Sequence, residues 1–192
     1  MKRLGWALVV NVAFVLAVLA TLFAFSPRRA RGAEGNARWS RSDLPIQVLV
    51  APEALDHHGA IARACLIINR AAGVYLFEHP RPASLVYVRE FMASGHGLRG
   101  HVLVRADGEW DPPRMHVEPV FSRPGRLYSV VITIPRARIE EWRLRAALVH
   151  EFIHAAGAMG HANHPGSIGF RGIVPEQDIG GRERRFLREY RP

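Results

Sequence analysis

Residues 150–157, HEFIHAAG, contain two histidines four positions apart, with a glutamate directly after the first; a third histidine follows at position 161. Side chains four residues apart lie on the same face of an α-helix, so His150 and His154 can reach the same metal ion. The carboxylate of Glu151 can then contact a water activated by the metal without binding the metal itself. This pattern is typical of zinc hydrolases that cleave amide bonds.

The sequence around the motif predicts the α-helix on which the metal-binding interpretation depends. Apolar side chains recur there at four-residue spacing: Leu144, Leu148, Phe152 and Ala156. This spacing gives an amphipathic helix a buried stripe. Glu140 and Glu141 suit the first turn, where acidic groups interact well with the helix dipole. We therefore predict a helix over about residues 140–156, with Gly157 directly after its end.

A long apolar run at the N-terminus predicts a membrane segment. Residues 4–25 contain no charged side chain and only Asn11 and Thr21 as polar ones, and they are long enough to cross the ~30 Å hydrocarbon layer. The run exceeds the ~7–15-residue apolar core of a cleaved signal peptide. We expect residues 1–25 to be a transmembrane anchor; a signal segment whose cleavage yields a secreted protein is the alternative. Because the run resembles an export signal, we expect the catalytic domain outside the cytoplasm.

Composition narrows the partners that the chain can bind. Its 192 residues suggest one domain plus an appendage, and its net charge of +9 comes almost entirely from arginine. The arginines are spread along the chain, and no basic cluster with interleaved aromatic residues predicts nucleic-acid binding. Cys65 is the only cysteine, which excludes an intramolecular disulfide and a cysteine-based zinc site. We expect a monomer that binds no nucleic acid.

The rest of the chain predicts an α+β domain. Polar residues 26–43 indicate a linker, so we expect the folded domain to span residues 44–192. Residues 58–72 show helical periodicity that ends at Gly73, and residues 182–191 suggest a C-terminal helix. Six stretches have the composition of strands: residues 45–51, 74–77, 84–91, 101–105, 115–121 and 127–134. Four further histidines lie at helix starts or on strands, and we expect none of them to bind metal: His57, His58, His101 and His116.

With Gly157 and His161, the motif resembles the metzincin zinc peptidases, whose signature is HExxHxxGxxH. In that family the glycine adopts a left-handed conformation and reverses the chain, and glycine does so at little cost. Residues 161–170, HANHPGSIGF, look like the matrixin segment that leads to a Met-turn, and residues 174–181, VPEQDIGG, resemble the start of the last matrixin helix. The resemblance implies a metzincin-like (zincin) domain: a mixed twisted sheet with two long helices and a C-terminal helix.

The sequence departs from the matrixin pattern at two positions. His161 lies seven residues after His154, where the family has six, and Gly160 could let the loop bulge enough to deliver His161. His164 is the alternative third ligand. Gly169 stands where the family has the Met-turn methionine, which packs beneath the metal site.

The resemblance implies a zinc-dependent endopeptidase. His150, His154 and His161 would bind Zn²⁺, and Glu151 would act as the general base. The substrate would be a peptide or protein bound along the sheet edge, with residues 170–175 lining a pocket beyond the scissile bond. Two alternatives remain open: a catalytically inactive metzincin-like domain that binds a peptide or protein, and a zinc hydrolase of a non-peptide amide.

Overall fold

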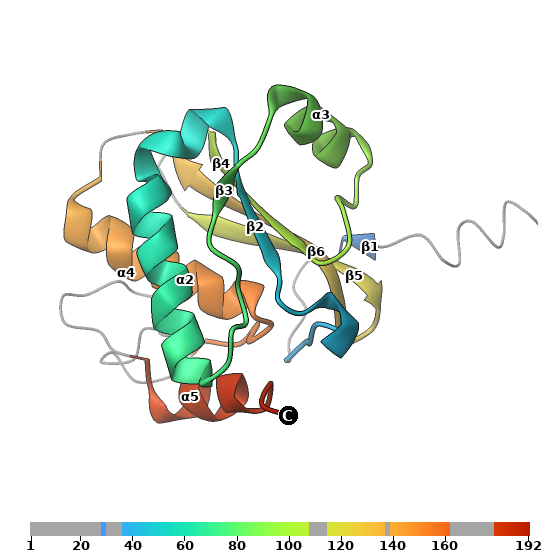
Figure 1. The fold of residues 1–192 in the computed structure, drawn as a ribbon, viewed down its shortest axis with the longest axis vertical. Coiled ribbons are helices and arrows are strands. Elements are labelled where there is room, and N and C mark those ends of the chain that lie inside the picture. The colour runs from blue at the N-terminus through green and yellow to red at the C-terminus, as the bar shows by residue number, and fades with distance from the viewer. Residues whose placement is uncertain (1–27, 30–35, 108–114, 137–138, 162–178) are drawn as a thin grey trace, which may run out of the picture.

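The computed structural model describes residues 28–29, 36–107, 115–136, 139–161 and 179–192. These residues form an α+β domain around a mixed sheet with the strand order β1-β5-β6-β4-β2-β3 (Figure 1). The predicted fold class is therefore confirmed at the level of an α+β domain with a mixed sheet. The predicted membrane segment, residues 1–25, lies outside the described residues, and no helix within them is long and apolar enough to cross a membrane.

The sheet combines a parallel centre with an antiparallel edge. Its strands are β1 (Arg28–Arg29), β2 (Gln47–Val50), β3 (Arg81–Pro82), β4 (His101–Asp107), β5 (His116–Arg123) and β6 (Arg126–Pro135). Strands β3, β2, β4 and β6 are parallel, whereas β5 is antiparallel to β6 and β1 is antiparallel to β5. Strands β5 and β6 form a hairpin, as the Pro-Gly turn between the two strand sequences indicates, with Gly125 at a φ of 71° in the turn.

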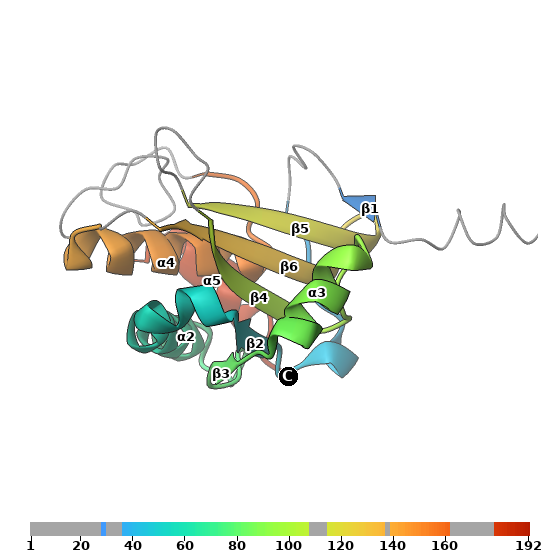
Figure 2. The same ribbon diagram turned by 90° about the horizontal axis from the view of Figure 1, so that it is seen from above.

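Helices cover both faces of this sheet. The α-helices are α2 (His58–Ala72), α3 (Leu85–Ala93), α4 (Glu141–Ala155) and α5 (Gly181–Arg188), and two short 3₁₀ helices are η1 (Arg41–Asp43) and η2 (Pro52–His57). Figures 1 and 2 show α2 and α4 side by side, with α3 apart from them. Helix α5 lies against the end of α2, where Arg191 donates a hydrogen bond to the carbonyl of Ala72.

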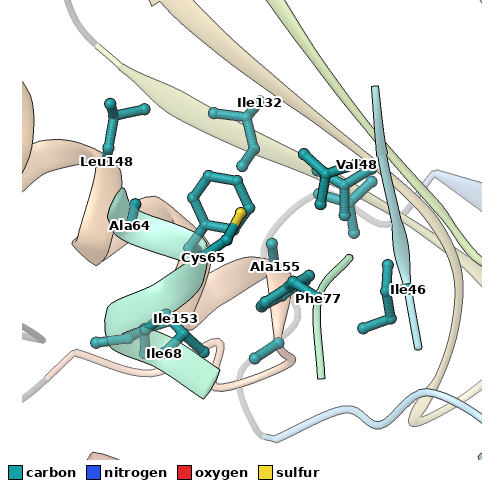
Figure 3. Close-up of a cluster of buried hydrophobic side chains, with 14 of the residues drawn as sticks. Ile46, Val48, Ala64, Cys65, Ile68, Phe77, Ile132, Leu148, Ile153 and Ala155 are labelled. Carbon is teal, nitrogen blue, oxygen red and sulfur yellow. The ribbon is translucent and has the colours of Figure 1, made fainter. Parts of the chain in front are cut away.

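The strands alternate their side chains between two cores, as a period of two requires. Val48, Val102 and Ile132 belong to the larger core, where Figure 3 shows Val48 and Ile132 among side chains of α2 and α4. Leu49, Leu103 and Val131 point to the other face, where they pack with the helix α3 residue Phe91. In the larger core, the Phe77 ring meets Phe152 of α4 edge to face, with their centroids 5.2 Å apart. This contact fixes α4 against the sheet.

Two predicted helices are confirmed closely. Helix α2 begins and ends where its periodicity predicted, and Gly73 follows it with a φ of 71°. Helix α4 covers most of the predicted residues 140–156, and its predicted apolar stripe is buried. Both segments have apolar side chains at helical spacing, and an α-helix places these side chains on one face that can be buried.

The strand predicted over residues 84–91 is wrong, because these residues form α3. The Ser84 hydroxyl caps the helix by accepting a hydrogen bond from the backbone N–H of Tyr87 at 3.1 Å. Tyr87, Val88 and Phe91 pack on the second core, whereas Val86 is exposed. That spacing is helical, and the β-branched and aromatic composition of the stretch concealed it.

The strand predicted over residues 74–77 is also wrong, because only a single bridge pairs Phe77 with Ile46. The Asn69 side chain replaces strand pairing in this segment. Its carbonyl oxygen accepts from the backbone N–H groups of Leu76 and Phe77, and its amide donates to the Phe77 carbonyl. A side chain that satisfies local backbone groups offers an alternative to a sheet ladder.

The predicted boundary between linker and domain at residue 44 lies too late in the chain. Ala37 and Trp39, both within the predicted linker, are buried in the larger core with 2% of their surface exposed. Arg38 between them is exposed and bridges to Arg126 of β6. The polar residues around Trp39 gave this stretch the composition of a linker, although its apolar side chains are part of the fold.

Candidate metal centre

Helix α4 brings the first two histidines of the motif together. The Nε2 atoms of His150 and His154 lie 3.0 Å apart, and both residues are at least nine-tenths buried. On the neighbouring side of the helix, Leu148 and Phe152 are fully buried in the larger core. The core therefore fixes the rotation of α4, and this rotation holds both imidazoles on one side of the helix.

A turn after α4 brings in the third histidine. Gly157 has a φ of 111°, which confirms the predicted positive value, and its backbone N–H donates to the His154 carbonyl. A Cβ added to Gly157 would lie 2.1 Å from the carbonyl oxygen of Ala37, so the turn has no room for a side chain there. At the far end of the turn, Arg182 donates to the carbonyl of His161 at 3.0 Å.

The three histidines form a compact cluster despite the extra residue between the second and the third. One ring nitrogen from each of His150, His154 and His161 lies within 4.8 Å of the other two. Ligand nitrogens about 2.0–2.1 Å from a tetrahedral zinc ion lie roughly 3.3 Å from one another. The cluster could thus hold a metal ion with small movements of its side chains.

The hydrogen bond of His154 orients its ring for metal binding. Its Nδ1 atom lies 2.6 Å from the carbonyl oxygen of Ala158, which can only accept a hydrogen bond. Nδ1 therefore carries the proton, and Nε2 presents a lone pair toward His150, as in many histidine ligands. Burial, with the nearby His150 as a lesser cause, lowers the pKa of His154 from 6.5 to about 4. The imidazole is accordingly neutral, as a metal ligand must be.

Glu151, which follows His150 in the sequence, is a buried acidic residue. Burial raises the pKa of its carboxyl group from 4.5 to about 7. The shift arises because burial removes water from the carboxylate and so disfavours its charged form. A cation held by the adjacent histidines would lower this pKa and favour the carboxylate.

The other histidines lie apart from this cluster. His58 contacts the carbonyl of Pro80, His101 contacts the carbonyl of Arg99, and His116 pairs with Glu118. Within the described ranges, only the three histidines of the motif and its turn form a group with metal-binding spacing. The alternative ligand His164, together with Gly169 and residues 170–175, lies outside the described residues.

Two aromatic residues outside the motif donate hydrogen bonds to the end of α4, and the motif itself does not predict them. Trp39 donates from its indole to the carbonyl of Ala155 at 2.8 Å, and the Tyr190 hydroxyl donates to the carbonyl of Ala156 at 2.6 Å. One signal was present, because Trp39 is a large apolar residue within an otherwise polar stretch.

No model of a protein family matches this sequence, and no curated protein sequence matches it significantly.

Proposed function

We propose that this protein is a zinc-dependent endopeptidase of the matrixin-like metzincin type. The observation that carries the proposal is the cluster of His150, His154 and His161 with the buried Glu151 directly beside it. Three neutral nitrogen ligands leave a tetrahedral metal one open position, which is the arrangement of a catalytic site. The mixed sheet and the positive φ of Gly157 agree with the sheet and the turn that the resemblance implies.

The donor set favours zinc. Imidazole nitrogens suit zinc, copper, iron and nickel, and three histidines with one open position are a ligand set of zinc hydrolases. The Nδ1 of His154 already donates to a backbone carbonyl, which is the outer contact that strengthens such ligands. When bound to this triad, zinc would supply a positive charge that polarises a water and the carbonyl of the scissile bond.

Glu151 is the group that would move the proton. Its carboxylate would accept a proton from the attacking water and then pass it to the nitrogen of the leaving amine. A group whose pKa is close to neutral pH can serve as both the base and the acid, because its protonated and ionised forms have similar free energies. In Glu151, burial raises the pKa to about 7 in the metal-free protein, and a bound cation would act in the opposite direction.

The sheet offers an edge for an extended peptide. Among the described residues, β1 pairs with β5 at Val120 and Phe121. In the described part of the chain, no strand pairs with the outer edge of residues 116–119. A peptide could add to this edge through backbone hydrogen bonds, which recognise an extended chain largely independently of its sequence. The proposed substrate is therefore a peptide or a protein segment that is unfolded locally.

We also place the enzyme at a membrane. The support is the apolar run over residues 4–25, which would anchor the chain with the catalytic domain outside the cytoplasm. The first described element after this run is β1, which pairs with β5 at the proposed substrate edge. In this arrangement, only a few residues separate the proposed anchor, residues 4–25, from β1 and the strand β5 with which it pairs.

A peptide digest with matched variants tests the proposal. The full chain loaded with zinc is incubated with a mixture of unstructured peptides, and the products are identified by mass spectrometry. We expect cleavage that a chelator abolishes and zinc restores. Glu151→Ala should abolish cleavage while the protein still binds zinc, because Glu151 is no ligand. Glu90→Ala is the control, since it removes an exposed glutamate from α3, away from both the motif and β5.

The outcomes separate the proposal from its alternatives. Zinc binding without cleavage of any peptide would contradict the endopeptidase and favour a domain that binds a partner. Cleavage of small amide substrates but not of peptides would indicate a hydrolase of another class. Loss of zinc from Glu151→Ala would show that the role assigned to this carboxylate is wrong.

A further inference from the structure

The C-terminal end of α4 is bound by residues from both ends of the described chain. The last carbonyls of a helix have no partner within the helix. At the end of α4, the carbonyls of three consecutive residues accept hydrogen bonds from residues outside the helix. They belong to Ala155, the last residue of α4, and to Ala156 and Gly157 after it. The Trp39 indole donates to the first at 2.8 Å, the Tyr190 hydroxyl to the second at 2.6 Å, and the Ala37 backbone N–H to the third at 2.7 Å.

The two side-chain donors also contact each other. The backbone N–H of Trp39 donates to the Tyr190 hydroxyl at 3.3 Å, so this hydroxyl accepts one hydrogen bond and donates another. Beside them, the side chains of Arg38 and Glu189 form an ion pair. We call Trp39 and Tyr190, with these hydrogen bonds, the cap of α4. It joins a segment before the sheet to the residues that follow α5.

The cap holds the turn on which the metal cluster depends. After Gly157 the chain continues to Ala158, whose carbonyl fixes the tautomer of His154, and then to His161. A shift of this turn would change the orientation of one ligand and the position of another. The contact between Gly157 and the Ala37 carbonyl leaves the turn little room on the side of the cap.

We propose that Trp39 and Tyr190 are positioning residues for the metal centre, which act by holding the turn between α4 and His161. This inference rests on the metal binding in the proposed function, but not on peptide hydrolysis. These side chains donate to the backbone of the turn, at the carbonyls of Ala155 and Ala156. Groups that orient ligands from such a distance affect metal affinity as well as stability.

Conservative variants test the cap. Trp39→Phe removes the indole N–H, and Tyr190→Phe removes one hydroxyl; both keep an aromatic ring in the core. Matched controls are Trp142→Phe, at the start of α4 and 38% exposed, and Tyr75→Phe, 60% exposed. The zinc Kd of each full-length variant is measured by competition with a chelator, under conditions in which circular dichroism shows every variant folded.

We expect the zinc Kd to rise roughly ten-fold in each cap variant, within the ~10–100-fold range for residues that orient ligands. The controls should stay within about two-fold of the wild type. The absorption spectrum of bound Co²⁺ gives a second readout, because it reports ligand geometry independently of hydrolysis. We expect this spectrum to change in the cap variants and not in the controls.

The results separate this inference from the proposed function. If the cap variants are less stable but have the wild-type zinc Kd and Co²⁺ spectrum, the cap serves stability alone and the inference is overturned. The proposed function would survive that result. A wild-type protein that binds neither metal would overturn both.

Discussion

The metal ligands come from two regions that the protein builds in different ways. His150 and His154 lie on α4, whose apolar stripe is buried in the larger core. His161 follows a turn held by hydrogen bonds from residues near both ends of the described chain. Spacing along a helix is enough to pair the first two ligands, whereas the third depends on contacts between residues far apart in the sequence.

Removal of a helix ligand should have the largest effect on metal binding. His154→Ala should weaken zinc binding roughly 1,000-fold, because about 10–16 kcal/mol of binding free energy is shared among a few ligands. Isothermal titration calorimetry or chelator competition measures the change, with His58→Ala as the control for loss of a histidine elsewhere. A Kd within ten-fold of the wild type would contradict the assignment of His154 as a ligand.

A side chain at the turn should destabilise the whole domain. Gly157→Ala places a Cβ close to the Ala37 carbonyl at a φ of 111°, so we expect a loss of about 3 kcal/mol in the free energy of unfolding. Gly59→Ala is the matched control in α2, because nothing lies within 4 Å of its added Cβ. Urea unfolding monitored by circular dichroism compares the two. Equal stabilities would show that the turn adapts to a side chain.

The burial of Glu151 should make the stability of the metal-free protein depend on pH. With its pKa raised from 4.5 to about 7, the folded state binds this proton more tightly than the unfolded state. Stability should therefore fall as the pH rises from about 4.5 to about 7, by up to about 3 kcal/mol. Glu151→Gln removes this loss, so the metal-free variant should be the more stable protein at pH 8.

The comparison of these two proteins isolates the carboxyl group. The pKa of His154 is lowered, which gives the opposite slope between about pH 4 and 6.5, and this contribution is the same in both proteins. Urea unfolding at pH 4.5 and pH 8 measures the difference. A stability difference that does not grow with pH would mean that Glu151 is not buried as an uncharged group.

Removal of the turn ligand should have a smaller effect than removal of the helix ligand. His161→Ala should weaken zinc binding roughly 10–100-fold, because the helix pair remains in place and a water can occupy the vacant position. His164→Ala is the decisive comparison and should leave the Kd within about two-fold. The reverse order would assign the third ligand to His164.

Much of the structure around α2 and α4 could be predicted because residues close together in the sequence determine it. The positions of α2 and α4 follow from apolar stripes, and the ligand pair follows from a spacing of four residues on α4. The hairpin between β5 and β6 follows from a glycine turn between two β-branched runs. In each case residues close in sequence also determine the structure.

The remaining features depend on contacts that no local pattern encodes. Helix α3 has the composition of a strand, and its helical spacing becomes evident from the packing of Tyr87, Val88 and Phe91 on the second core. Trp39 lies in a stretch with the composition of a linker, but its indole binds a carbonyl 116 residues away in the sequence. The positive φ of Gly157 was predicted from the motif, whereas the contacts that hold its turn were not.

The central claim is that the three histidines bind one zinc ion. The direct test is the metal content of the purified full chain by elemental analysis, after reconstitution with zinc and dialysis, beside His154→Ala. We predict one zinc per wild-type chain and almost none in the variant. A wild-type chain that stays metal-free after reconstitution, or a variant that retains as much zinc as the wild type, would contradict the claim.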